Sequence, residues 1–411
     1  MQPVEAAAPA TAGAYRWIIL LVVWFGYLLS FVDRLIWTSV GSMAASAYGL
    51  SLAALGLFVT AFYAGYVVSQ ALTGLASDWI GPRLMLVIAL VPLGAFTFAF
   101  GLTSSVTLGL VLQALMGLTA GADFAAGVKL IVSWFPVQQR GRAMGLFMTA
   151  TSLGVVVTNA AVPRALHYVA WPAVYHVAGL VTAAFGALCY VVLRDSPAGE
   201  TTPPIRWSDL RAMMASRQYV FIVLAGLGGV WGTWGYAIWA SSLMTRGLHF
   251  SAVTAGGIVA AFGIVAVAGK PAIGLVSDFL GGRRRSLVMI DLLLFSALLV
   301  LTGRLGTVTQ FWIVAPFLGL TAFAYSPLSN TMAAEAGGNA AGSAAGISAA
   351  IGSIGTMIVP LVVGVGFQAT RSYEVAFAIL AAGPFLGALC MLAVRDISTE
   401  HRTIEDAAHV R

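Results

Sequence analysis

The sequence predicts an all-α membrane protein of twelve transmembrane helices arranged as two six-helix halves, and three observations support this. First, 60% of the 411 residues are hydrophobic and 9% are charged, with a mean hydropathy of +0.93, whereas a soluble domain carries roughly a quarter charged residues. Second, apolar segments of about twenty residues, long enough to cross a bilayer as helices, recur along the chain. Third, the polar decapeptide at 74–83 recurs at 274–283 with six identical residues.

Short polar breaks separate the apolar segments, so each segment is expected to form one membrane-spanning helix. The first has no small-residue cleavage site after a short apolar core, which favours a retained helix over a signal peptide. The decapeptide follows the second segment, and its copy follows the eighth. In chain order, the predicted spans are 17–41, 52–73, 84–103, 106–134, 143–164, 171–193, 219–242, 251–276, 286–304, 307–334, 343–367 and 372–395.

The repeat extends beyond the decapeptide. Gly-Leu-Thr-Ala occurs at 117–120 and at 319–322, and Gly-Ala-Leu-Cys occurs at 186–189 and at 387–390. Matches in the same order at nearly the same offset indicate a six-plus-six duplication, and parallel repeats of this kind are typical of one large class of transporters. The expected units are an N-terminal tail at 1–15, a first half at 16–193, a Pro- and Arg-containing linker at 194–218, a second half at 219–395 and a C-terminal tail at 396–411.

The arginines predict the orientation of the helices. With a cytoplasmic N-terminus, fourteen arginines fall on the cytoplasmic side, and four (Arg164, Arg246, Arg304 and Arg371) fall on the far side. This positive-inside bias places both termini in the cytoplasm. The net charge of +6 therefore reflects topology and does not indicate nucleic-acid binding, because the arginines are scattered over separate loops.

Several motifs resemble the major facilitator superfamily over residues 15–396. The decapeptide resembles its signature between helices two and three, with a weaker copy between helices eight and nine. The pair Asp33-Arg34 resembles that of the anion:cation symporter family and its sugar-phosphate-permease relatives, as do segments 134–143 and 346–360. The resemblance implies the major facilitator fold and transport of anions, often with protons. We expect a multi-pass protein of a bacterial inner (plasma) membrane that functions as a monomer without a cofactor or metal.

The chain departs from that family in helix four, where an acidic residue preceded by an arginine is usual. The aligned position is Ala120, and Asp123 follows about one turn later. The glycine-and-proline motif typical of helix five in drug/proton antiporters is missing from 145–162, which disfavours drug efflux.

Ionisable side chains inside a membrane cost at least about 2.5–3.5 kcal/mol each, so each needs a reason. Arg34 is the first candidate for substrate binding, because a guanidinium offers a planar fork of donors to a carboxylate or phosphate. Asp33 and Asp123 are the candidates for proton coupling. The alternatives are structural: Arg34 would neutralise an acid such as Asp123, and Asp33 would pack against a neighbouring helix. Adjacent residues point about 100° apart on a helix, so Asp33 and Arg34 need not pair.

Both lysines of the chain, Lys129 and Lys270, fall near cytoplasmic ends of predicted spans. Each is a candidate substrate contact, and Lys129 could instead extend to the membrane interface. Asp291 lies near the arginines at 283–285, which favours a structural salt bridge.

Setting the halves in register places Arg34 opposite Trp234, and Asp123 opposite Tyr325. We therefore expect charges from the first half to face aromatic rings from the second half across a central cavity. Such a cavity suits an anion with an apolar or flat body.

Trp231 shares a broad helical face with Trp234 and is also expected to bind substrate. An interfacial belt of aromatic residues is the alternative, and it suits Tyr236 and Trp239 near the far-side end.

The two decapeptides are expected to form cytoplasmic gates, because a carboxylate is stabilised beside the start of a neighbouring helix. The resemblance implies that this neighbour is helix eleven. The gating residues are predicted to be Asp78, Arg83, Arg140, Arg142, Asp278 and Arg283.

The leading hypothesis is a secondary active transporter that moves an organic anion by alternating access with proton symport. One alternative is a proton-coupled efflux pump for amphipathic compounds. An alternative of another class is a non-transporting membrane sensor of the same fold. An enzyme is not expected, because the histidines lack metal-ligand spacing and neither a nucleophile elbow nor a phosphate-binding loop is present.

Overall fold

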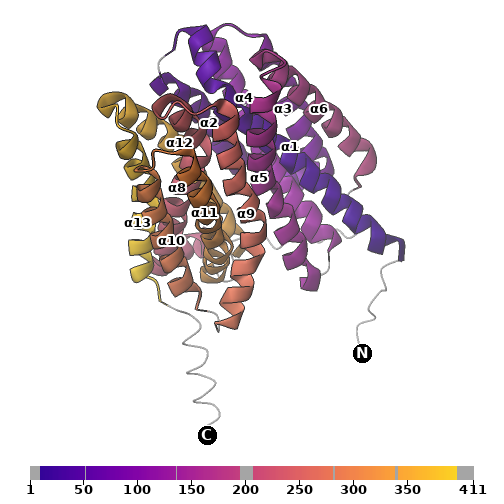
Figure 1. The fold of residues 1–411 in the computed structure, drawn as a ribbon. Helices are drawn as coiled ribbons and strands as arrows, with labels where there is room; N and C mark the ends of the chain where they lie inside the picture. Colours follow the sequence, from indigo (N-terminus) through magenta and orange to yellow (C-terminus); the bar gives the residue numbers. More distant parts are fainter. Residues whose placement is uncertain are drawn as a thin grey trace, which may run out of the picture.

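The computed structural model describes residues 10–50, 52–135, 137–194, 207–280, 283–337 and 341–395. The regular structure in these residues is entirely α-helical (Figure 1). The helices are α1 (Ala10–Tyr48), α2 (Leu52–Ile80), α3 (Pro82–Leu102), α4 (Val106–Trp134), α5 (Val137–Ala165), α6 (Trp171–Val192), α7 (Trp207–Ala215), α8 (Arg217–Gly247), α9 (Ala252–Phe279), α10 (Arg284–Thr302), α11 (Val308–Ala336), α12 (Ala341–Thr370) and α13 (Tyr373–Leu392).

Among the described residues, eleven helices are long and apolar enough to cross a membrane. In α2 the apolar segment is the shorter stretch Leu55–Gln70. Helices satisfy their own backbone hydrogen bonds, which is why they can span a bilayer. The prediction of an all-helical, multi-pass membrane protein is confirmed.

Several helices extend beyond the predicted spans. The helix α1 continues to Tyr48, and α5 begins at Val137, because hydropathy marks only the part of a helix that faces hydrocarbon. The short helix α7 lies inside the segment predicted as a linker. Met213 anchors it, since this side chain is buried in a cluster with Tyr219 and Ile222 of α8.

Helices α1–α6, which we call the N-terminal group, pack against one another, as do α8–α13, the C-terminal group. The packing follows one plan: α2 on α4, α3 on α6 and α1 on α5 in the first group, and α9 on α11, α10 on α13 and α8 on α12 in the second. The groups meet where α2 contacts α12 and where α5 contacts α9, and both pairs lie side by side in Figure 1. The helices α1 and α8 are also in contact.

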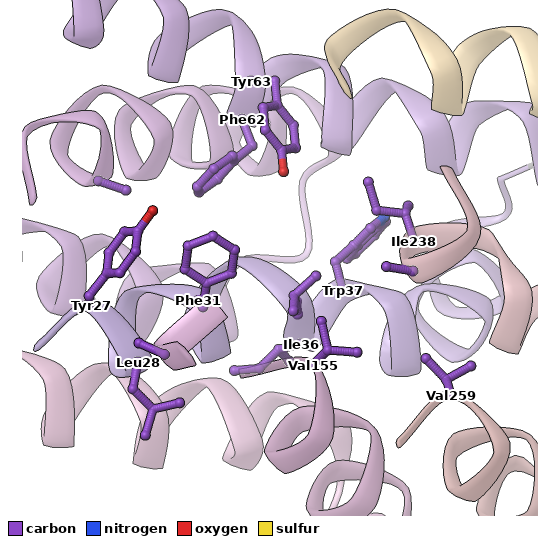
Figure 2. Close-up of a cluster of buried hydrophobic side chains, with 14 of the residues drawn as sticks. Tyr27, Leu28, Phe31, Ile36, Trp37, Phe62, Tyr63, Val155, Ile238 and Val259 are labelled. Carbon is purple, nitrogen blue, oxygen red and sulfur yellow. The ribbon is translucent and has the colours of Figure 1, made fainter. Parts of the chain in front are cut away.

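Contacts between the groups are close at the end where α1 ends and α2 begins, which we call the far end. Ile36 and Trp37 of α1 and Val155 of α5 share a buried cluster with Ile238 of α8 and Val259 of α9 (Figure 2). These five side chains form one apolar seam between the groups.

The backbone approach between the groups is also tight there. A Cβ atom at Gly256 of α9 would lie 2.3 Å from the Asn159 carbonyl oxygen of α5. The Thr60 hydroxyl of α2 donates a 2.9 Å hydrogen bond to the Met357 carbonyl of α12. The far end is therefore closed.

Candidate functional site

A cavity of about 200 Å³ lies between the two groups. Seven helices line it: α1, α2, α4 and α5 from one group and α8, α11 and α12 from the other. The lining residues are Tyr27, Phe31, Arg34, Tyr63, Tyr66, Gln70, Phe124, Met148, Thr151, Gly226, Val230, Trp234, Tyr325, Ser326, Ser329, Asn330, Ser348, Ala349, Gly352, Ser353 and Thr356.

Arg34 is the cation in the cavity wall, and aromatic rings surround it. Its guanidinium carbon lies 4.2 Å from the ring centroid of Phe31 and 4.3 Å from that of Tyr66. The rings of Phe62 and Tyr63 lie at 5.2 and 5.6 Å, and Figure 2 shows both beside Phe31. Such cation–π contacts stabilise a partly desolvated guanidinium while leaving its N–H donors available.

Two donor atoms of Arg34, Nε and Nη2, are buried and have no hydrogen-bond partner among the described residues. These atoms form one edge of the guanidinium, the edge that binds a carboxylate through two parallel hydrogen bonds. A buried donor without a partner is unfavourable. An anion that enters the cavity would satisfy both donors at once.

Asp123 lies behind the cavity wall, one residue before the lining residue Phe124. It is 1% exposed, and neither carboxylate oxygen has a hydrogen-bond partner in the described structure. Its electrostatic partner is Arg34, and the hydroxyl of Ser30 is nearby. The structure thus brings Asp123 and Arg34 into one electrostatic unit without an ion pair between them.

Asp33 points elsewhere. Its carboxylate is 1% exposed and lies beside Thr97 of α3 and Thr182 of α6, away from the cavity lining. The 100° rotation between adjacent helical residues separates it from Arg34. Asp33 therefore belongs to a buried polar cluster inside the N-terminal group.

The aromatic wall predicted for the second half is present only in part. Trp234 and Tyr325 line the cavity, and Trp234 lies 5.4 Å from the ring of Phe31. Tyr325 is seated against Gly229, where a Cβ atom would lie 2.3 Å from its ring.

Trp231 faces α13 instead of the cavity, contrary to the prediction. Its indole N–H donates a 2.9 Å hydrogen bond to the Ile379 carbonyl, and its ring packs over Gly383. Tyr236 and Trp239 do not form an interfacial belt either, because they are only 1% and 3% exposed. Helical spacing predicts the angles between these side chains around α8, but it does not predict which side of α8 faces the cavity.

Polar residues without charge make up much of the wall, and none of them except Tyr325 was predicted from the sequence. Tyr63, Tyr66 and Gln70 follow one face of α2 at spacings of three and four residues. Ser353 of α12 donates a 3.1 Å hydrogen bond to the Gln70 side-chain oxygen. Polar residues at helical spacing inside apolar spans were a readable signal.

The two lysines occupy different environments. Lys270 of α9 lies directly behind the cavity wall, because its ammonium donates to the hydroxyl of Thr151 at 2.8 Å and contacts the Met148 carbonyl at 3.5 Å. Lys129 is half-buried on α4 and is not among the lining residues.

Four of the predicted gating residues, Asp78, Arg140, Arg142 and Asp278, have side chains outside the part of the chain that the structure describes. Arg83 is described, and its guanidinium donates to the Tyr190 carbonyl and lies 4.6 Å from the Tyr190 ring. It thereby joins the start of α3 to the end of α6.

In the C-terminal group the matching contact comes from Arg285, although the decapeptides align Arg83 with Arg283. Arg285 donates to the carbonyls of Met391 and Leu392, joining the start of α10 to the end of α13. Arg283 is exposed before the first turn of α10 and makes no side-chain cap. The reason is that α10 begins two residues later, relative to the repeat, than α3 does.

The salt bridge expected for Asp291 is absent among the described residues. Arg284 pairs with Glu335, and Arg285 donates to backbone carbonyls. Asp291 Oδ2 is buried without a partner.

Known proteins are similar to this chain over most of its length. The family model of the Major Facilitator Superfamily matches residues 23–278 and 222–409. The probable sulfoacetate transporter SauU of Cupriavidus necator is 25% identical over 96% of this chain and 97% of its own length. The membrane sensor protein UhpC of Salmonella typhimurium is 30% identical over 46% of this chain and 43% of its own length.

A solved structure shows the same fold. It is a bacterial homologue of the human lysosomal transporter Spinster in an inward-facing and unoccupied conformation, with a TM-score of 0.72 and 16% identity over 95% of this chain and 97% of that chain.

Proposed function

Because the chain belongs to the Major Facilitator Superfamily, we propose that it is a secondary active transporter that carries a small organic anion by alternating access. The observation that carries this proposal is the pair of buried, unpartnered donors on Arg34 in the cavity wall. Similarity to a protein named as a sulfoacetate transporter supports an organic anion as substrate.

The proposed topology has twelve spans, with α2 as the span that hydropathy alone leaves short, and cytoplasmic termini in a bacterial inner membrane. The excess of arginine on one side supports the orientation. Both helix groups of one chain contribute to the cavity wall, so the proposed site can form within a monomer, which we take as the working unit.

We assign the coupling proton to Asp123. When ionised, this carboxylate attracts Arg34 and competes with an incoming anion. A proton on Asp123 removes that competition, so that anion and proton bind together, which is symport. Asp33 lies apart from Arg34 and serves as the comparison residue.

The size and lining of the cavity favour a small anion over a large amphipathic efflux substrate. Pockets for drug-sized ligands enclose about 300–1,000 Å³, whereas this cavity encloses about 200 Å³. Phe31, Phe124 and Trp234 offer apolar surface to the body of the anion. Hydroxyl groups of α11 and α12 offer partners to its remaining polar atoms.

We further propose that the N-terminal and C-terminal groups rock about this cavity, with the decapeptides as cytoplasmic gates. In this scheme Asp78, Arg140, Arg142 and Asp278 act between the groups. Lys129 would meet the anion on its way to the cytoplasm.

Uptake into proteoliposomes tests the proposal. The full-length protein should accumulate a labelled carboxylate such as sulfoacetate only when a pH gradient, acidic on the far-end side, is imposed. Arg34→Gln should weaken binding by roughly 2–5 kcal/mol, and Arg34→Lys should recover part of it, because the charge returns without the fork. Unchanged binding in Arg34→Gln would remove Arg34 from the site.

Asp123→Asn should still exchange anion across the membrane but lose the response to the pH gradient, and Asp33→Asn should keep that response. The opposite result would move the proton to Asp33. A membrane sensor, the function named for one relative, would bind the anion without any uptake, and the same assay reveals that outcome.

A further inference from the structure

Lys270 is a second cation at the cavity, and it comes from the opposite group of helices. Its ammonium reaches from α9 across the interface to Thr151 of α5. Both Thr151 and Met148, whose carbonyl it also contacts, line the cavity that holds Arg34. Lys270 therefore stands one side chain away from the cavity, behind the wall that the substrate would touch.

The surroundings of this ammonium are neutral. Its nitrogen lies 4.8 Å from the ring centroid of Phe323, and its hydrogen-bond acceptors are one hydroxyl and one carbonyl. Among the described residues, no acidic side chain forms a hydrogen bond or ion pair with it. An ammonium has three donors, and a buried charge is stabilised by an opposite charge that accepts them.

Arg34 of the N-terminal group and Lys270 of the C-terminal group thus share one property. Each is a cation at the cavity without an ion-pair partner in the described structure. Asp123 interacts with Arg34, but nothing acidic among the described residues does so with Lys270. A substrate with one acidic group can satisfy only one of them.

We propose that the transported molecule carries two acidic groups, one bound by Arg34 and the other by Lys270; this rests on the proposed function of the cavity as an anion site. The second acidic group replaces the Thr151 hydroxyl as the hydrogen-bond acceptor of the Lys270 ammonium. Because the Lys270–Thr151 hydrogen bond joins α9 to α5, its replacement by a substrate contact also frees one tie between the groups. The substrate then lies between one cation of each group.

Binding measurements on the purified full-length protein test this inference. The probes are the linear dicarboxylates malonate, succinate, glutarate and adipate, each compared with its own monoamide, which has nearly the same size but one charge fewer. In the wild type, at least one diacid should bind about tenfold or more tightly than its monoamide, because a charge-assisted hydrogen bond exceeds a neutral one.

Variants locate the second charge. Lys270→Gln should weaken the diacid to the affinity of its monoamide and leave the monoamide unchanged, whereas Lys270→Arg should keep the difference. Arg34→Gln should weaken both probes. Thr151→Val should increase the preference for the diacid, because the Lys270 ammonium then gives up no hydrogen bond to a hydroxyl when it binds the second acidic group. Thermal unfolding and gel filtration of each variant confirm folding, and the Thr151 variant tests the inference if Lys270→Gln does not fold.

The outcomes separate this inference from the proposed function. If no diacid exceeds its monoamide, or if the preference survives in Lys270→Gln, the inference is overturned. The anion site then still stands, provided that Arg34→Gln weakens whichever carboxylate binds. If no carboxylate binds, or if Arg34→Gln changes nothing, the proposed function itself fails.

Discussion

In the N-terminal group, α4 crosses α2 where a Cβ atom on Gly117 would lie 1.8 Å from the Phe62 carbonyl oxygen. In the C-terminal group, α11 crosses α9 where a Cβ atom on Gly319 would lie 2.0 Å from the Phe262 carbonyl oxygen. The same residue types make the same close crossing in both groups. Only glycine permits such an approach of two backbones, so this contact constrains the residue type in both places.

The cavity wall shows the opposite behaviour. Arg34 of α1 faces the cavity from one group, and Trp234 of α8 faces it from the other. On α11, Tyr325 stands in the wall at the position that the repeat aligns with Asp123 of α4. Backbone crossings that hold each group together are alike, whereas side chains that meet the cavity differ. The comparison separates residues that build the scaffold from residues that select the substrate.

The largest expected effect comes from breaking the shared crossing. Gly117→Ala and Gly319→Ala should each destabilise the protein by roughly 1–3 kcal/mol or more, because the added methyl group forces two helices apart. Thermal unfolding of the purified variants measures the loss. Equal losses would show that the two groups depend on their crossings to the same degree.

Matched controls exist on both sides of the comparison. A Cβ atom on Gly145 of α5 or on Gly346 of α12 would meet no neighbouring side chain or helix of the described structure within 4 Å. Alanine at either position should therefore be neutral or stabilising by up to about 1 kcal/mol. If Gly319→Ala were tolerated as well as Gly346→Ala, the crossing in the C-terminal group would not be a structural constraint.

The second effect concerns the closed far end, where the groups meet. Gly256→Val should push α9 away from Asn159 of α5 and open this end. In a background of Ile238→Cys and Cys390→Ala, the residue-238 thiol should then react with a maleimide about tenfold faster, a shift of about 1.4 kcal/mol.

The neighbouring Gly257 provides the control for this experiment. A side chain there meets Trp312 of the same group, so Gly257→Val should leave the reactivity of the introduced cysteine unchanged. Equal acceleration by both variants would mean that general loosening, and not separation of the groups, exposes residue 238.

The sequence was sufficient for the membrane class, the superfamily and the approximate positions of the long helices, because apolar length and the repeated decapeptide are local signals. It also singled out Arg34, Trp234 and Tyr325, which the structure places in the cavity wall. Helix rotation was not accessible in this way. Trp231 lies three residues from Trp234, yet it faces α13, because Gly383 leaves room for its ring.

Uncharged polar residues were missed for a different reason. A search for charges inside apolar spans passes over Tyr66, Gln70 and Ser353, although each lines the cavity. Their signal is spacing along one helical face, and its meaning depends on which face the neighbouring helices leave open. That property belongs to the packed bundle and not to the segment.

The smallest expected effect tests which residues of the two halves correspond to each other. The decapeptides align Arg83 with Arg283. In the structure, however, the residue whose contact matches that of Arg83 is Arg285: Arg83 donates to the carbonyl of Tyr190, and Arg285 donates to the carbonyls of Met391 and Leu392. Arg83→Gln and Arg285→Gln should each lower the free energy of unfolding by roughly 1 kcal/mol, since each loses charged hydrogen bonds to carbonyls at a helix end. Arg283→Gln should leave it unchanged.

Thermal unfolding of the three variants under identical conditions distinguishes the two registers. A loss in Arg283→Gln with none in Arg285→Gln would restore the alignment read from the decapeptides. The expected result is that Arg285→Gln lowers the free energy of unfolding and Arg283→Gln does not. This result means that the second half has gained two residues before α10. The tie between helix ends has then been kept by a different arginine, so the contact, and not the aligned position, is what the duplication preserves.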